Sequence, residues 1–164
     1  MIVITPDRLA EADPAQLASA SECVIAIAGG NVAGRSAAAL LLSDYAVMTP
    51  AASITLDGAL AWAGVIWRLG DHALRLHVSA TRTQTIPPAQ ALELGLIDEI
   101  AADVDQWRRR FLDGRSALAL DSAAMLIGRR GGDALERAEF ARLFSMGEPQ
   151  RGLRSFLEKR RPQF

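Results

Sequence analysis

The chain has 164 residues, half of them hydrophobic, and its 18 basic residues are balanced by 19 acidic ones. This length and composition suffice for one globular domain with a hydrophobic core of its own. The formal net charge of −1 gives no electrostatic reason to expect nucleic acid or an anionic membrane as a partner.

The residues that bind metals or form disulfides are scarce. Cys23 is the only cysteine, which excludes an internal disulfide, and His72 and His77 are the only histidines. We therefore expect no metal site. Residues 1–5 are apolar over too short a stretch for a signal peptide, and no apolar run reaches membrane-spanning length. The expectation is a cytoplasmic protein without a membrane partner.

The first half of the chain alternates apolar strands with an apolar helix. A short strand is predicted over Ile2–Thr5, and the continuous apolar run Cys23–Ala28 predicts a strand that is covered on both faces. Helix formers predict a buried helix over Ser36–Leu42. Further strands are expected at Tyr45–Met48 and Ser53–Leu56, so this half contains a βαβ unit.

Beyond Ala59 the spacing of apolar residues becomes helical. Helices are predicted over residues 69–78, 88–94, 104–112, 117–127, 134–144 and 152–159. The pair Gly131-Gly132 predicts a hinge before a terminal helical hairpin. We therefore expect an α/β core over residues 1–100 and a helical region over residues 101–164, within one structural domain.

A glycine-containing turn, Ala28–Ser36, joins the predicted buried strand to the predicted buried helix. Glycine permits positive φ, and the free N–H groups in the first turn of a helix can stabilise an oxyanion. The same glycines can instead serve only to make a tight turn. The turn has neither the Gly-Lys-Ser/Thr ending of a phosphate loop nor the G-x-G-x-x-G of a dinucleotide site.

Three segments in the right order resemble the crotonase (enoyl-CoA hydratase/isomerase) superfamily. Val24–Gly34, followed by the helix and Ser43-Asp44, resembles the family's strand, glycine turn and helix. Ala89–Ile100 is similar to its helix and short return strand, and Phe144–Phe164 resembles its C-terminal tail. The resemblance implies an α/β fold with a ClpP/crotonase-like ββα core and a helical C-terminal region, shortened at the N-terminus.

The resemblance also implies positions for the catalytic groups. The family's second oxyanion donor, a backbone amide, falls on Arg35, with Gly34 before it. The Arg35 side chain can crowd an acyl channel or attract a CoA phosphate. The family's two catalytic glutamates fall on Ala38 and Gly58, which cannot transfer protons. The loop after the first strand lacks the family's pattern, so the first oxyanion donor has no assignment.

Asp57 is the carboxylate nearest to these positions in the sequence. It is a candidate base for an isomerase-type reaction through an enolate. The alternative is that Asp57 forms a turn with Gly58, since Asp-Gly pairs favour turns.

Three further residues are candidates for substrate binding. From the resemblance, Phe156 lines an acyl pocket, its own or a neighbouring subunit's, and Lys159 contacts the CoA nucleotide. Ordinary helix packing and a solvated basic helix end are the alternatives. Trp62 can line an apolar ligand pocket or, like Trp67, pack in the core or in a subunit interface. His72 and His77 receive no catalytic role.

The function that the resemblance implies is binding of an acyl-CoA thioester, as in fatty acid metabolism, with enolate stabilisation by a backbone oxyanion hole and without a cofactor. It also implies a homo-oligomer, a trimer or hexamer, or pairing with a homologous subunit. Two alternatives stay open. One is a catalytically inactive protein with a binding or structural role, and the other is a hydrolase or decarboxylase of the same superfamily.

Overall fold

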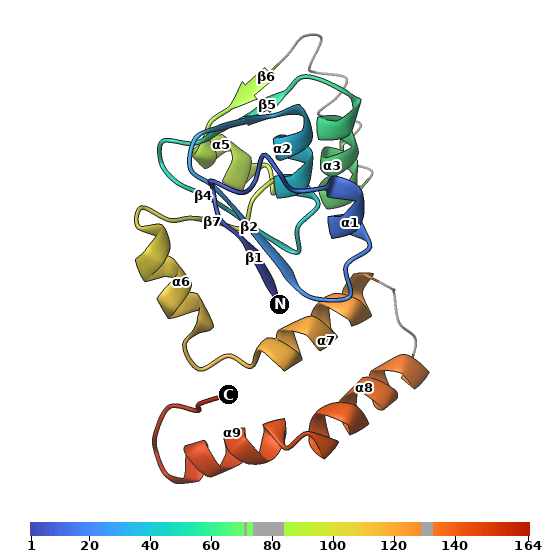
Figure 1. Cartoon of the computed structure of the whole chain (residues 1–164), viewed down its shortest axis with the longest axis vertical. Coiled ribbons are helices and arrows are strands. Elements are labelled where there is room, and N and C mark those ends of the chain that lie inside the picture. Colours follow the sequence, from blue (N-terminus) through green and yellow to red (C-terminus); the bar gives the residue numbers. More distant parts are fainter. Residues whose placement is uncertain (71, 74–83, 129–132) are drawn as a thin grey trace. The chain divides into compact units, whose positions relative to one another are not determined.

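The computed structural model describes residues 1–70, 72–73, 84–128 and 133–164. The chain divides into two compact units. The α/β unit comprises Ile2–Ala20 and Val24–Val104, and the helical unit comprises Asp105–Phe164 together with Met1 and Ser21–Cys23. Figure 1 labels the helices and strands of both units, which are described in turn.

A parallel sheet forms the centre of the α/β unit, with its strands in the order β1-β2-β4-β7 (Figure 1). These strands are β1 (Ile2–Ile4), β2 (Val24–Ala28), β4 (Tyr45–Met48) and β7 (Glu99–Ile100). Every residue of β2 is buried, as its continuous apolar run predicts. The parallel pairing of β2 with β4 confirms the predicted βαβ unit.

A second sheet has the order β3-β5-β6. Its strands are β3 (Asn31–Ala33), β5 (Ser53–Leu56) and β6 (Gln84–Ile86). β3 runs parallel to β5, and β6 runs antiparallel to it. The strand β5 has the predicted bounds, whereas β3 and β6 were not predicted. Each of these has only three residues, too few for a period-two pattern to be seen.

Four described helices belong to this unit: α1 (Pro14–Ala18), α2 (Gly34–Leu41), α3 (Ala59–Leu69) and α5 (Pro88–Glu93). The helix α2 begins two residues before the predicted Ser36, and α3 was not predicted. Helices α2 and α3 pack so closely that a Cβ atom added to Gly64 would lie 2.6 Å from Cβ of Leu41. Most of the helix predicted over residues 69–78 lies outside the described residues.

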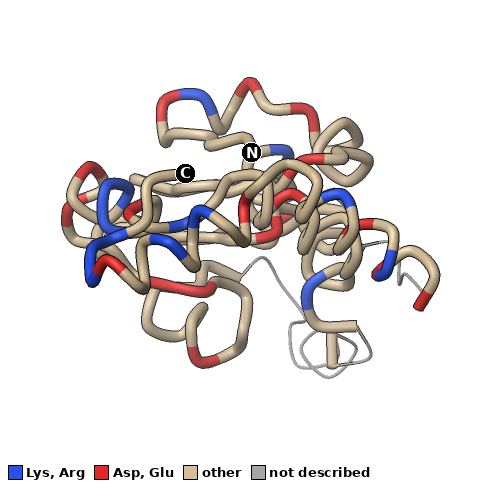
Figure 2. The backbone as a smooth tube through the Cα atoms, turned by 90° about the horizontal axis from the view of Figure 1, so that it is seen from below, with Lys and Arg blue, Asp and Glu red and all other residues tan. Residues whose placement is uncertain are grey.

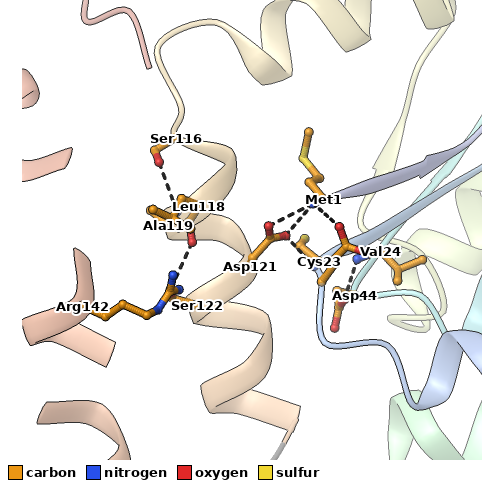
Figure 3. A network of polar contacts seen from close by, with 11 residues as sticks. Met1, Cys23, Val24, Asp44, Ser116, Leu118, Ala119, Asp121, Ser122 and Arg142 are labelled. Atoms are coloured by element: carbon orange, nitrogen blue, oxygen red, sulfur yellow. Dashed lines mark hydrogen bonds and ion pairs between the residues drawn. The ribbon is translucent and has the colours of Figure 1, made fainter. Parts of the chain in front are cut away.

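Two aspartates join neighbouring strands of the parallel sheet in the same way. Asp44 Oδ2 accepts a hydrogen bond from Val24 N (2.7 Å), and Asp44 N donates to Val24 O (2.8 Å). Asp98 Oδ2 accepts from Ala46 N (2.7 Å), and Asp98 N donates to Ala46 O (2.8 Å). Each aspartate thus satisfies both backbone groups of one residue in the adjacent strand. Figure 3 shows Asp44 beside Val24.

The helical unit contains α6 (Val104–Leu112), α7 (Ala117–Gly128), α8 (Asp133–Ser145) and α9 (Glu148–Leu157), with the first residue of α6 at the unit boundary. All four match predicted helices, although α9 begins four residues before the predicted Gly152. The predicted hinge at Gly131-Gly132 lies outside the described residues.

Polar contacts hold the helical unit together. The Glu139 carboxylate on α8 accepts hydrogen bonds from Ser122 Oγ on α7 (3.0 Å) and Arg142 Nε (2.9 Å). On α7, Asp121 Oδ1 accepts from Cys23 N (2.8 Å) and contacts the Met1 nitrogen (2.9 Å). Figure 3 shows Asp121 and Ser122 on the same helix, with Arg142 reaching Ser122. Apart from the bond between Glu139 and Arg142, which lie three residues apart on α8, these contacts join residues far apart in the sequence and so depend on tertiary structure.

Acidic and basic residues are interspersed along the chain, as Figure 2 shows. This distribution agrees with the formal net charge of −1. Among the described residues, no helix is both long enough and apolar enough to cross a membrane.

Candidate functional site

The segment between β2 and α2 contains β3 and leads directly into Gly34, the first residue of α2. Gly34 begins α2 with a φ of +48°, in the left-handed region that favours glycine. The first turn of the helix is fixed by Ser36, whose Oγ accepts from Ala33 N (3.1 Å) and donates to Ala33 O (2.9 Å). The segment is therefore ordered by its own side chains.

Asp57 lies beside the start of this helix. Its Oδ1 accepts a hydrogen bond from Gly34 N at 2.8 Å. The contact follows from the parallel register of β3 and β5, in which Ala33 pairs with Thr55, so the residues that follow the two strands also meet. A carboxylate is favourable at a helix N-terminus, where backbone N–H groups carry partial positive charge. Asp57 thus places a negatively charged carboxylate at the N-terminus of α2.

Arg35 is directed to another partner. Its guanidinium lies 3.5 Å from Oδ1 of Asp13, the carboxylate that caps α1 by accepting from Ala15 N (3.1 Å). The Arg35 side chain therefore has a carboxylate partner of its own. For the Arg35 backbone amide, by contrast, no hydrogen bond to another described residue is found.

Ala38 and Gly58, the positions onto which the sequence resemblance places the family's two glutamates, differ in environment. Ala38 is fully buried in α2, and its Cα lies 3.5 Å from where a Cβ on Gly64 would be. A longer side chain at position 38 would therefore enter the contact between α2 and α3. Gly58 is exposed and precedes α3. Neither residue supplies a group that can transfer a proton.

The tryptophans of α3 have different surroundings. Trp62 is half-buried and packs against the hydrophobic core, whereas Trp67 is 53% exposed. His72 is exposed, and His77 lies outside the described residues. The described residues include no cluster of His, Cys, Asp and Glu that could hold a metal ion.

The two candidate residues of the tail belong to the helical unit. Phe156 lies on α9 and is 78% exposed, which excludes ordinary core packing for its side chain in this chain. Lys159 follows α9 with a φ of +52°, and its backbone N–H donates to Phe156 O (3.1 Å). These two residues remain predicted substrate contacts.

The structure thus brings together Gly34 and Asp57 and leaves the Arg35 amide unbonded beside them. The salt bridge from Arg35 to Asp13 was not predicted, because it joins the first turn of α2 to the residue that caps α1, and no local pattern connects these two positions. Asp44 was noted only for its place in a motif. Its role in joining β2 to β4 emerges from the backbone hydrogen bonds.

Solved structures that are similar to this chain include enoyl-CoA hydratases and isomerases. An enoyl-CoA hydratase from Polaromonas sp. JS666 matches with a TM-score of 0.71 at 22% identity, over 96% of this chain and 70% of that one. An enoyl-CoA hydratase/isomerase from Marinobacter aquaeolei matches with a TM-score of 0.67 at 22% identity, over 92% of this chain and 63% of that one.

The chain has the crotonase fold. An enoyl-CoA hydratase/carnithine racemase from Magnetospirillum magneticum gives a TM-score of 0.73 at 18% identity, over 92% of this chain and 62% of that one. No protein-family model and no curated protein matches the sequence. The chain spans less than two thirds of the length of the Marinobacter aquaeolei and Magnetospirillum magneticum structures.

Proposed function

We propose that this protein binds an acyl-CoA thioester and stabilises its enolate. The main observation in support is that the Asp57 carboxylate lies at the first turn of α2, where its Oδ1 accepts a 2.8 Å hydrogen bond from Gly34 N. A carboxylate base and a backbone donor are the two groups that an enolate reaction requires.

In the proposed reaction, Asp57 removes a proton from the carbon next to the thioester carbonyl. The electron pair of the broken C–H bond moves onto the thioester oxygen, which becomes the enolate oxyanion. The Arg35 amide donates a hydrogen bond to this oxygen, and returning the proton to the same or a conjugated carbon completes exchange or isomerisation. Losing one such backbone donor typically slows a reaction by about a hundred- to a thousand-fold.

The remaining candidate residues, which are apolar or basic, are proposed to contact the acyl group and the CoA nucleotide. Trp62 contacts the acyl group from α3. Phe156 and Lys159 contact the acyl group and the CoA nucleotide from the tail, in the same chain or a neighbouring copy. No cofactor is needed for this chemistry.

The proposed assembly is a homo-oligomer formed through α9. Leu153, Phe156 and Leu157 on this helix are each at least 60% exposed. Exposed apolar side chains gathered on one helix mark a surface that a partner covers. A trimer or hexamer, or a pairing with a homologous subunit, would bury them.

A catalytically inactive binding protein is the second candidate. It is favoured by Ala38 and Gly58, because the two positions at which hydratases of this fold carry glutamates here lack a proton-transfer group. In that case Asp57 is only the N-terminal anion of α2. A base and a structural anion differ in whether the carboxylate must be able to accept a proton.

The substitution Asp57→Asn separates the two candidates. An amide oxygen can still accept the hydrogen bond from Gly34 N, but it cannot take a proton at neutral pH. We expect wild-type protein to bind acetyl- or crotonyl-CoA more tightly than free CoA in calorimetric titration, and to exchange the α-protons of acetyl-CoA with solvent in D2O. Asp57→Asn should keep the binding and lose the exchange by at least about a hundred-fold.

Glu11→Gln, which alters an exposed carboxylate of the same unit, is the matched control and should leave exchange unchanged. Acyl-dependent binding without exchange in the wild type would support the inactive binding protein. Absence of acyl-dependent binding would overturn both candidates, and exchange that survives in Asp57→Asn would remove this residue from the mechanism.

A further inference from the structure

Arg35 occupies a position at which a basic side chain is unfavourable. It is the second residue of α2, and the N–H groups in the first turn of a helix carry partial positive charge. The first turn of α2 contains no acidic residue that would offset this charge. Natural sequences break local preferences of this kind mainly at functional sites. The Arg35 guanidinium is therefore a candidate for a function of its own, besides that of the backbone amide.

The guanidinium is placed by a carboxylate but is not fixed to it. Its Nη2 lies 3.5 Å from Oδ1 of Asp13, and the two side chains are 58% and 38% exposed. Ion pairs as exposed as this one contribute little to stability. Asp13 is held independently, because its Oδ1 accepts from Ala15 N (3.1 Å) as the cap of α1. The pair with Asp13 therefore leaves Arg35 able to bind a second anion.

The hydrogen-bond donors of this guanidinium are not used by the described part of the chain. A guanidinium carries five N–H donors in a planar fork. Among the described residues, Arg35 makes an ion contact with Asp13, and no hydrogen bond from its guanidinium is found. No salt bridge between Arg35 and Asp57 is found among these residues either, although Asp57 also lies at the start of α2. The fork is thus open to an anionic group of a ligand.

The shape of the fork and the position of the thioester select the anion. Arginine pairs bidentately with carboxylates and phosphates, which present two oxygens side by side. When a thioester oxygen binds the Arg35 amide, the acyl chain lies close to the side chain of the same residue. The CoA phosphates lie far away, because the whole pantetheine arm separates them from the thioester. A carboxylate on the acyl chain is therefore the anion within reach of this guanidinium.

We propose that Arg35 selects acyl-CoA compounds whose acyl chain ends in a carboxylate. The inference rests on the proposed function, since it requires a thioester oxygen at the Arg35 amide. The substrate carboxylate accepts hydrogen bonds from the donors that Asp13 leaves unused. Arg35 is then a specificity-determining residue, and Asp13 competes with the substrate for its positive charge.

The charges at the start of α2 make Arg35 necessary for this preference. Asp13 and Asp57 are both carboxylates, and like charges repel a further carboxylate. With Arg35 present, the substrate carboxylate gains an opposite charge and a bidentate partner. Without it, the same carboxylate would meet only repulsion from Asp13 and Asp57. Loss of Arg35 should therefore reverse the preference and not merely weaken it.

Calorimetric titration with matched pairs of ligands tests the proposal. Malonyl-CoA is compared with propionyl-CoA, and succinyl-CoA with butyryl-CoA, the neutral compounds with the same number of acyl carbons; free CoA is the control. We expect the wild type to bind at least one carboxylate-bearing compound about ten-fold more tightly than its neutral partner. In Arg35→Gln, the carboxylate-bearing compound should bind more weakly than the neutral one.

Two further variants separate the role of Arg35 from that of net charge. Asp13→Asn keeps an oxygen that can cap α1 and removes the competing negative charge, so it should strengthen binding of the carboxylate-bearing compound several-fold. Arg8→Gln removes an exposed arginine of the same unit and should leave the ratio of the two affinities as in the wild type. Circular dichroism checks that each variant is folded.

The outcomes distinguish this inference from the proposed function. Neutral acyl-CoA binding tighter than that of free CoA, without a preference for the carboxylate, would overturn the inference and leave the proposed function standing. A preference that survives in Arg35→Gln would assign it to another residue. Equal weakening of every ligand in Arg35→Gln, free CoA included, would make Arg35 a phosphate contact and also overturn the inference. Absence of any acyl-dependent binding would overturn both, and the wild-type comparison decides if a variant does not fold.

Discussion

The α/β unit and the helical unit treat large apolar side chains differently. In the α/β unit, the side chains of Leu40, Ile54 and Leu96 are completely buried. In the helical unit, Ile127 is 79% exposed and Phe140 is 62% exposed. Although α3 of the α/β unit also exposes a few apolar side chains, the core of that unit is closed. The comparison shows that the α/β unit closes its hydrophobic core, whereas the helical unit leaves several large apolar side chains exposed.

We expect the largest difference between the two units when one leucine in each is replaced by alanine and the loss in free energy of unfolding is compared. Leu40→Ala removes a fully buried side chain and should lower the free energy of unfolding by about 2–5 kcal/mol. Leu153→Ala, at a position 60% exposed, should change it by less than about 0.5 kcal/mol in the monomer. Urea unfolding followed by circular dichroism measures both values.

The same pair of variants separates stability from association. We expect Leu153→Ala to weaken self-association in sedimentation experiments, because the truncated side chain belongs to the apolar surface of α9. A comparable loss of stability in the two variants would show that the helical unit buries Leu153, and the contrast between the units would then be wrong.

The second prediction concerns the close contact between α2 and α3. Gly64→Ala should destabilise the protein by about 1–3 kcal/mol, because the added Cβ would lie 2.6 Å from Cβ of Leu41. Alanine otherwise favours a helix over glycine by roughly 1 kcal/mol, so helix propensity predicts the opposite sign. Thermal unfolding gives the sign directly. Ala63→Gly, at an exposed position one residue earlier, is the control, and it should destabilise through propensity alone.

The parts of the fold predictable from sequence are those with long or fully buried segments. The strand β2 was recognised because all of its residues are apolar, and α6 because its apolar spacing is regular. The helix α3 was missed because the family resemblance suggested a shortened loop over Ala59–Gly64, although its alanines favour a helix and Gly64 allows close packing against α2. Local patterns do not report such a helix contact.

The candidate site was also predictable from the sequence only in part. The turn before α2 was predicted from its glycines, and Gly34 does adopt positive φ. The hydrogen bond from Gly34 to Asp57 depends on the register of β3 and β5, two strands that are distant in sequence. The salt bridge from Arg35 to Asp13 likewise depends on tertiary structure. Sequence can therefore nominate residue types for a site, whereas their partners require the fold.

The smallest expected effect is a pH dependence within the helical unit. The hydrogen bond from Arg142 lowers the pKa of Glu139 below its ordinary value of 4.5, with burial acting in the opposite direction and Ser122 lowering it further. A carboxyl group with a lowered pKa stabilises the folded state at pH values above its ordinary pKa. This stabilisation is lost as the pH falls through the pKa of the folded state.

Glu139→Gln should therefore be less stable than the wild type at neutral pH, and the difference should vanish in acid. Trp107, the one tryptophan outside α3, reports unfolding of the helical unit when Trp62 and Trp67 are replaced by phenylalanine. Glu136→Gln, at an exposed position on the same helix, should show no such pH dependence. A stability difference that is equal at pH 7 and in acid would mean that Glu139 acts through packing, because only its charged form accepts these hydrogen bonds with full strength.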